Sequence, residues 1–187
     1  MSSYEKEWRV FKHFLHAEFV HDLNRYEWSD SLKKIKMHDT FNSDIDKVKW
    51  PNSIETLQFG LYFDQPVENV IWPSSLKTLI FGNNFNQRVE NIKWPKNLNV
   101  VHFGNKFNQM ILDTQWPEET TLVLTDSNEN TINHLPQNLK YLKINYLNCP
   151  LINLPITLRK LDILFDDNNY LEMSKIPYNC EINIFKK

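Results

Sequence analysis

The chain has 187 residues and a net charge of −2, with 41% hydrophobic and 24% charged residues. This composition excludes a disordered chain, and no run of 18 or more apolar residues predicts a membrane-spanning helix. The two cysteines, Cys149 and Cys180, are too few for a disulfide framework. The chain also holds 23 Asn but only one Ala, which favours frequent turns over long helices.

Residues 1–27 are expected to cap the beginning of a repeat array. Apolar residues recur there at intervals of three and four, which predicts an amphipathic helix. They are Tyr4, Trp8, Phe11, Leu15 and Phe19. The alternative is a degraded repeat with a strand near residues 10–15. Charged residues among these positions exclude a secretory signal peptide, and we therefore expect a cytoplasmic protein.

Tryptophan recurs every 22 residues through the middle of the chain. The series consists of Trp28, Trp50, Trp72, Trp94 and Trp116. Leu-Pro and Ile-Pro pairs continue it at intervals of 19 to 22 residues. Residues 28–175 are therefore predicted to form a solenoid, because so short a unit buries its apolar face only against its neighbours. Residues 176–187 are predicted to end the array as a capping strand.

Each unit contains a strand pattern, Leu-x-x-Leu-x-Phe, which three of the units follow with Gly. In one unit the pattern ends at Leu79 and Phe81, whose side chains would point to the same side of a strand. Gly82 comes next, and its position requires either positive φ or a close approach of backbone. The unit that begins at Trp116 is degenerate, and its Leu122 and Leu124 fit one place out of phase.

The second half of each unit disfavours a long helix, because it is rich in Asn and includes Pro66. We expect an irregular or 3₁₀ return, in which a repeated polar column satisfies backbone groups from coil to coil. That column consists of Asn42, Asp64, Asn86 and Asn108. The predicted fold is therefore a mainly β solenoid, leucine-rich-repeat-like, with a parallel sheet of about seven or eight short strands.

The segments Phe85-Asn86-Gln87 and Phe107-Asn108-Gln109 carry a resemblance to a known family. Lying between Trp-Pro starts and Leu-x-x-Leu-x-Phe-Gly strands, they resemble the FNIP repeats of social amoebae and of giant viruses of amoebae. The resemblance is closest over residues 50–115. It implies a leucine-rich-repeat-like interaction protein, located in the host cytoplasm if the chain is viral. Some family members add an F-box that recruits a ubiquitin ligase, but residues 1–27 are shorter than such a domain.

The outward positions of the predicted strands are basic. They hold eight Lys or Arg against two acidic residues, an excess of +6 in a chain of net charge −2. Ile80 and Val100, with Leu122 or Leu124, add apolar surface near the middle. We predict that this face binds a protein partner of acidic character, the alternative being a solvated sheet. The predicted binding residues are Lys33, Lys34, Lys36, Lys77, Ile80, Val100, His102, Lys140, Tyr141, Lys143, Arg159 and Lys160.

No pattern in the sequence predicts catalysis, a metal site or a cofactor. His13 and His16 lack a third ligand at a suitable spacing, and the two cysteines have no neighbouring ligand or base. The acidic residues do not cluster as glycoside cleavage requires. We therefore predict a non-catalytic interaction module without a cofactor. The alternatives are a structural or self-associating protein, including a homo-oligomer, and a nucleic-acid binder that uses the basic face.

Overall fold

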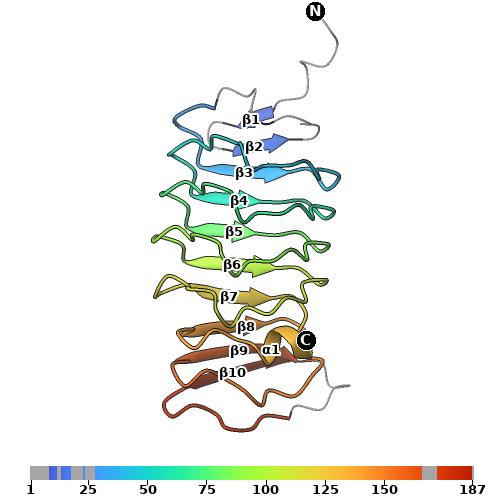
Figure 1. Ribbon diagram of the computed structural model, residues 1–187, viewed down its shortest axis with the longest axis vertical. Helices are drawn as coiled ribbons and strands as arrows, with labels where there is room; N and C mark the ends of the chain where they lie inside the picture. The colour runs from blue at the N-terminus through green and yellow to red at the C-terminus, as the bar shows by residue number, and fades with distance from the viewer. Residues whose placement is uncertain (1–8, 12–13, 18–22, 24–27, 166–171, 187) are drawn as a thin grey trace, which may run out of the picture.

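The computed structural model describes residues 9–11, 14–17, 23, 28–165 and 172–186. These residues form one sheet of ten strands, which are stacked in the order in which they occur in the chain (Figure 1). The strands are β1 (Arg9–Phe11), β2 (Phe14–Ala17), β3 (Lys34–Met37), β4 (Thr56–Gln58), β5 (Thr78–Ile80), β6 (Val100–Phe103), β7 (Thr121–Leu124), β8 (Tyr141–Ile144), β9 (Lys160–Phe165) and β10 (Glu181–Lys186).

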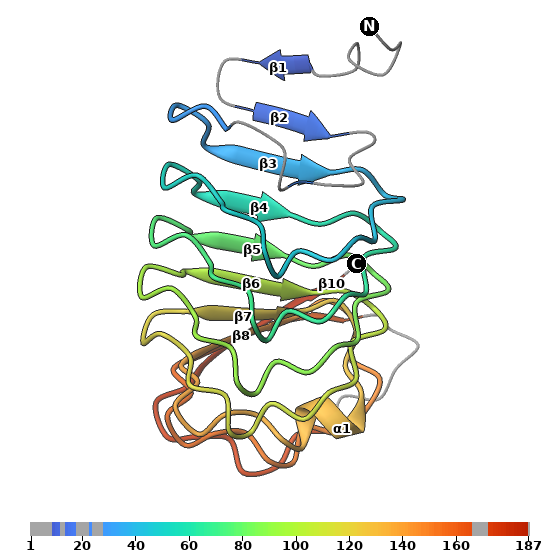
Figure 2. The ribbon, with the colours of Figure 1, turned by 45° about the horizontal axis from the view of Figure 1, so that its top comes forward.

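From β2 to β10 every neighbouring pair of strands is parallel. The register joins identical repeat positions, so that Leu79 lies between Leu57 and Val101. Figure 2 shows the strands stacked on one side of the array and the irregular returns on the other. The predicted leucine-rich-repeat-like solenoid is therefore confirmed, and the repeat phases become ladders of side chains between the strands and the returns.

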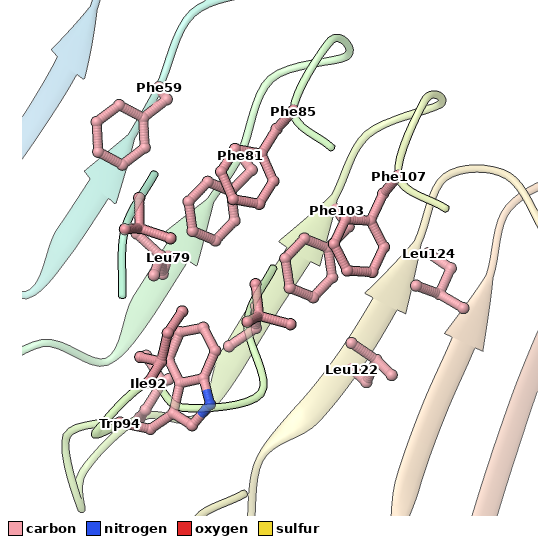
Figure 3. Close-up of a cluster of buried hydrophobic side chains, with 14 of the residues drawn as sticks. Phe59, Leu79, Phe81, Phe85, Ile92, Trp94, Phe103, Phe107, Leu122 and Leu124 are labelled. Atoms are coloured by element: carbon pink, nitrogen blue, oxygen red, sulfur yellow. The ribbon is translucent and has the colours of Figure 1, made fainter. Parts of the chain in front are cut away.

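The core consists of these ladders (Figure 3). Phe85 is fully buried, and its ring stacks between those of Phe63 and Phe107 at centroid distances of 6.1 and 6.2 Å. The ring of Phe81, the residue directly after β5, lies 4.0 Å from that of Phe85. Trp94 packs against Trp116 at 4.8 Å. Because each unit contributes one apolar residue, aromatic in the middle of the array, to each column, every coil covers the apolar face of the coil before it.

The three glycines share one repeat position because the coils pack closely there. None of the three glycines has positive φ, so that alternative for Gly82 is wrong. A Cβ atom at Gly82 would instead overlap the carbonyl oxygen of Gly60, and one at Gly104 would overlap that of Gly82. The alternative of close backbone approach is therefore confirmed, because the coils meet here through backbone alone.

The polar column closes the turns that follow the strands. The Oδ1 atom of Asn42 accepts a hydrogen bond from the backbone N–H of Asp64 at 2.9 Å, and Asp64 Oδ1 does the same for Asn86. Asn86 Oδ1 in turn accepts from the N–H of Asn108 at 2.8 Å. The expected structural role is thus confirmed for Asn42, Asp64 and Asn86, since each of these side chains satisfies a backbone donor of the next coil.

The degenerate unit is displaced by one residue, as its sequence predicted. Leu122 pairs with Val101 and Leu124 with Phe103, and both leucines are buried. The return of this unit contains a short helix, α1 (Glu129–Ile132), whose N-cap Asn128 accepts from the N–H of Thr131. The returns between β3 and β7 that precede α1 are irregular, as expected.

The predicted N-terminal helix is wrong over the residues that the structure describes. Residues 9–11 and 14–17 form β1 and β2, an antiparallel pair. In the register of the sheet, Leu15 lies opposite Ile35 of β3. Pairing with β2 satisfies the backbone groups along the edge of β3, which a helix would leave without hydrogen bonds. These inter-strand hydrogen bonds stabilise the strands more than the local helical spacing favours a helix. The remaining positions of the predicted helix lie outside the described residues.

At the other end of the sheet, β10 pairs with β9 along six residues. Ile182 and Ile184 continue the inward columns of Leu161 and Ile163, in agreement with the predicted last strand. Lys186 lies at the end of this strand.

Candidate interaction surface

The twelve predicted binding residues lie on one face of the sheet, in three rows that run along the array. The first row precedes the strands, and the second and third are the outward positions within them. The first row contains Lys33, Glu55, Lys77, Asn99, Lys140 and Arg159. The second contains Lys34, Thr56, Thr78, Val100, Thr121, Tyr141 and Lys160. The third contains Lys36, Gln58, Ile80, His102, Val123, Lys143 and Asp162.

Ion pairs neutralise part of the first row. The Glu55 carboxylate lies between two lysines, 2.9 Å from Lys33 Nζ and 2.7 Å from Lys77 Nζ. Hydrogen bonds from Lys77 and Lys33 lower the pKa of Glu55 to about 2. These three residues occupy one row because they share a repeat position in successive coils, so the arrangement follows directly from the 22-residue period.

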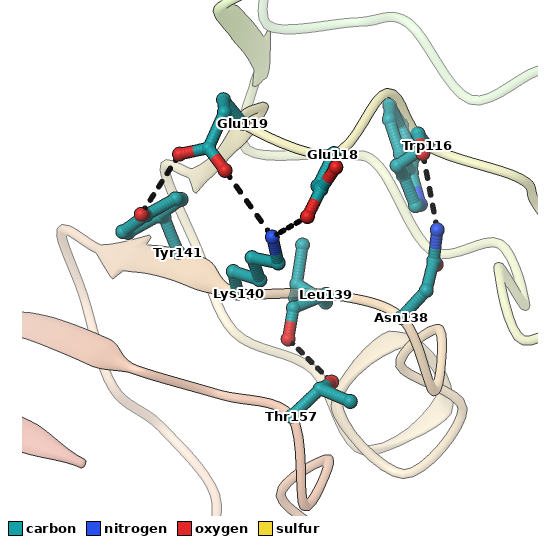
Figure 4. Close-up of polar contacts among 8 residues, drawn as sticks. All are labelled: Trp116, Glu118, Glu119, Asn138, Leu139, Lys140, Tyr141 and Thr157. Carbon is teal, nitrogen blue, oxygen red and sulfur yellow. Dashed lines mark hydrogen bonds and ion pairs between the residues drawn. The ribbon is translucent and has the colours of Figure 1, made fainter. Parts of the chain in front are cut away.

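A second charged cluster surrounds Lys140 (Figure 4). The Lys140 ammonium contacts the carboxylates of both Glu118 and Glu119, and only 11% of the Lys140 side chain is exposed. The hydrogen bond that Lys140 donates to Glu118 is the main cause of a raised pKa at Lys140. The Tyr141 hydroxyl donates to Glu119 Oε2 at 2.9 Å, and this bond is the main cause of a lowered pKa at Glu119. Tyr141 and Lys140 are therefore held in place by the preceding unit.

The sequence analysis missed Glu118 and Glu119, because the degenerate unit had no assigned register. With these two acids included, the positive excess of the face falls from +6 to +4. The remaining excess is spread over all three rows, and the third row holds Lys36 and Lys143 against Asp162. Lys36 is near one end and Lys143 near the other, and within the described residues neither forms an ion pair.

The middle of the face is apolar or uncharged. Ile80, Val100 and Val123 are half-buried on β5, β6 and β7, and threonines lie between them. The expectation that Leu122 or Leu124 would add to this patch is wrong, since both belong to the core. Val123 takes their place, because the one-residue shift of β7 reverses which side chains point outward.

His102 lies within this apolar middle, between Ile80 and Val123 of the neighbouring strands. Its Nε2 atom shares a hydrogen bond of 2.7 Å with Thr125 Oγ1. Burial, and to a smaller extent the charge of Lys143, lower the pKa of His102. The imidazole therefore stays neutral at neutral pH and adds to an uncharged centre with basic ends.

No grouping that suggests metal or membrane chemistry occurs in the part of the chain that the structure describes. Within it, no three His, Cys, Asp or Glu residues are placed to hold a metal ion. Cys149 and Cys180 are half-buried free thiols that pack against the core, and burial raises the pKa of both. No helix among the described residues has the length and apolar character that crossing a bilayer requires.

A strand that is followed by Gly, and then by Phe and Asn in the turn, is the pattern of a known class of repeat. Residues 63–106 match the family model of the FNIP Repeat. The match includes the polar turns that contain Phe63 and Phe85. A search among curated proteins finds no match.

Among solved structures, the chain is similar to CroV588, a giant-virus protein whose crystal structure is described as a novel circular LRR protein structure. The two are 28% identical and superpose with a TM-score of 0.64 over 91% of this chain. This chain spans 26% of the length of CroV588, about a quarter of it.

Proposed function

We propose that the protein is a non-catalytic interaction module that binds a protein partner through the outward face of β3–β8. The observation that carries this proposal is the third row, where an uncharged centre of Ile80, His102 and Val123 lies between Lys36 and Lys143. Interfaces of this type combine an apolar centre with a charged rim. Leucine-rich-repeat-like solenoids commonly serve as interaction scaffolds, which supports the same assignment. Cytoplasmic location remains an expectation.

The row also indicates the form of the partner. Its two lysines are separated by five strand spacings, or about 24 Å. An α-helix of about 16 residues covers that length. The partner segment that fits is therefore an amphipathic helix with apolar residues in the middle and an acidic residue near each end.

The test replaces Ile80 with a photo-crosslinking amino acid and exposes the protein to an extract of amoebal cells, which the FNIP repeats suggest as the source. The same replacement at Asn91, on the exposed return side, is the matched control. We expect one protein to crosslink from position 80 and not from position 91. Crosslinking of that protein from position 91 alone would place the interface on the return side and contradict the proposal.

Two sets of variants then separate charge from apolar contact. Lys36→Glu with Lys143→Glu should lower the association rate of the captured partner several-fold, with an effect that shrinks as salt is added. Ile80→Ser should raise the dissociation rate with little dependence on salt. Thermal melting of each variant checks that it remains folded, because Lys36 and Ile80 are half-buried although they lie outside the core. Glu68→Lys with Glu90→Lys, on the return side, should leave both rates unchanged.

Lys140 is unsuitable for such a test, although it is among the predicted binding residues. Its ammonium contacts two carboxylates, and its removal would leave Glu118 and Glu119 close together without a counter-charge. A loss of binding in a Lys140 variant would therefore report on the local structure as well as on the partner.

A nucleic-acid ligand for the same face is the second candidate. This candidate is less well supported, because Glu55 and Asp162 lie among the basic residues of the face and because the centre of the face is apolar. A steep fall in the logarithm of the association constant with the logarithm of the salt concentration would favour the nucleic-acid ligand.

A further inference from the structure

A second surface lies beside the strand face, where the turns that follow the strands are stacked. It is a groove of about 730 Å³ whose lining is dominated by amide side chains. The lining includes Asn42, Asp64 and Asn86 of the polar column, together with Tyr62, Asn84 and Lys106. The volume falls within the range of small-molecule sites, and the binding function proposed for the strand face makes no use of this groove.

The polar column holds its side chains in one orientation. In Asn42, Asp64 and Asn86 the Oδ1 atom accepts both a backbone N–H and the side-chain amide of a Gln in the next coil, at 2.8–3.0 Å. An amide nitrogen cannot accept a hydrogen bond, so the two Asn side chains cannot be flipped. The second terminal atom of each side chain is thereby fixed in position as well.

These second atoms carry no hydrogen bond among the described residues. They are Nδ2 of Asn42, Oδ2 of Asp64 and Nδ2 of Asn86. Since they belong to successive coils, they follow one another at the strand spacing of about 4.8 Å. The groove therefore presents a fixed row of donor, acceptor and donor, and binding a ligand would require little ordering of these side chains.

We infer that this groove, which we call the amide groove, binds a neutral oligosaccharide. A sugar hydroxyl both donates and accepts, so adjacent hydroxyls can accept from the two amides and donate to Asp64 Oδ2. Tyr62, in the same coil as Asp64, is 51% exposed and offers an aromatic ring against which a sugar ring can pack. No bond is made or broken in this binding.

Two other ligand classes fit the amide groove less well. A phosphate or other anion would meet the carboxylate of Asp64, and Lys106 is the one cation named in the lining. An extended peptide directs carbonyl groups to one edge at every second residue, about 6.6–6.8 Å apart, which does not match a row spaced at about 4.8 Å. Hydroxyls on a sugar chain are denser and can meet each atom of the row.

The test titrates the full chain with three linear hexasaccharides, cellohexaose, maltohexaose and chitohexaose, and follows backbone and side-chain amide signals by NMR. We expect at least one of them to shift the signals of residues 62–64 and 84–86. Failure of all three to bind would overturn the inference, as would a shift confined to the strand face. A lysine-rich peptide that binds the groove when the sugars do not would assign it to a peptide instead.

The polar column supplies a matched variant. Asp64→Asn retains the Oδ1 acceptor, as Asn42 and Asn86 do in their own coils, but converts the free acceptor into a donor. We expect the melting temperature to be retained and the affinity for the sugar to fall at least about tenfold, as loss of a charged hydrogen bond predicts. Asp39→Asn is the control, because Asp39 Oδ1 also accepts an N–H from the next coil, at Leu61, but does not line the groove.

Tyr62→Ala tests the same site without touching the polar column. It should weaken sugar binding whether or not Asp64→Asn folds. Sugar affinity that is unchanged in both the Asp64→Asn and the Tyr62→Ala proteins would overturn the inference. Because neither residue lies in the three rows of the strand face, the partner of that face should bind both variants normally, and the two proposals can fail separately.

Discussion

Single atoms decide how closely the coils approach. At Gly82 a hydrogen atom occupies the place where any other residue would carry a Cβ, directly against the carbonyl oxygen of Gly60. The polar column also depends on single atoms. One oxygen of Asp64 takes the place of water as the acceptor for the N–H of Asn86. Both positions are determined by the neighbouring coil, so their requirements recur with the repeat.

Gly82→Ala should therefore destabilise the protein although its φ is negative. The added methyl group forces two coils apart, and overpacking of this kind costs about 1–3 kcal/mol or more. Chemical denaturation of the variant checks the loss. Asn83→Ala, one residue further on and exposed, is the control and should change the free energy of unfolding by less than about 0.5 kcal/mol. Equal stability of Gly82→Ala and wild type would contradict the close approach.

At the scale of the element, the strands place like repeat positions side by side, and charges therefore meet from coil to coil. Lys33, Glu55 and Lys77 form such a row across β3–β5. Lys140 with Glu118 and Glu119 forms another between the units of β7 and β8. These ion pairs connect neighbouring coils just before their strands begin. The third row differs from the first in that an uncharged centre lies between Lys36 and Lys143.

The Glu55 row should make stability depend on acid. The pKa of Glu55 is about 2 in the folded protein, against 4.5 for a glutamate without these partners. The unfolded chain therefore binds the proton more readily than the folded protein does. The stabilisation is therefore present above pH 4.5 and is lost progressively as the pH falls toward 2. We expect Glu55→Gln to lower the melting temperature slightly at pH 7, and the difference from wild type to shrink between pH 4.5 and 2.

Salt provides the control for this effect. Glu55 and its two lysines are solvent-accessible, so added salt should reduce the difference between Glu55→Gln and wild type at pH 7. A difference that persisted unchanged at low pH would mean that the amide substitution disturbs packing and that the ion pairs contribute nothing measurable.

At the scale of the whole molecule, contacts are made between neighbouring coils, and the stability of the array is a sum of local terms. Leu161→Ala, in β9, should cost about 2–5 kcal/mol, because Leu161 is fully buried between Leu142 and Ile182. Hydrogen exchange followed by mass spectrometry should show reduced protection in β8–β10 and near-normal protection in β4–β6. Equal loss of protection throughout would show that the array unfolds as a single unit.

The sequence by itself determined the parts of the protein that repeat. The columns that contain Phe81, Phe85 and Trp94, the polar column and the outward face of the strands all follow from the 22-residue period, because identical phases in parallel coils must lie side by side. The alternation of Leu122 and Leu124 also indicated a shift of one residue in the degenerate unit, but it did not determine which of the side chains there point outward.

The tertiary structure decided what depends on neighbours rather than on the period. Residues 9–17 follow a helical spacing, yet the described part forms strands because β3 offers an edge to pair with. The sequence left open whether Gly82 is required for positive φ or for close approach of backbone, and the carbonyl group of the preceding coil decided this. The outward position of Val123 and the pairing of Lys140 with two glutamates depended on the register of β7. In each case the deciding atoms lie in another coil, and local sequence carries no information about their distance.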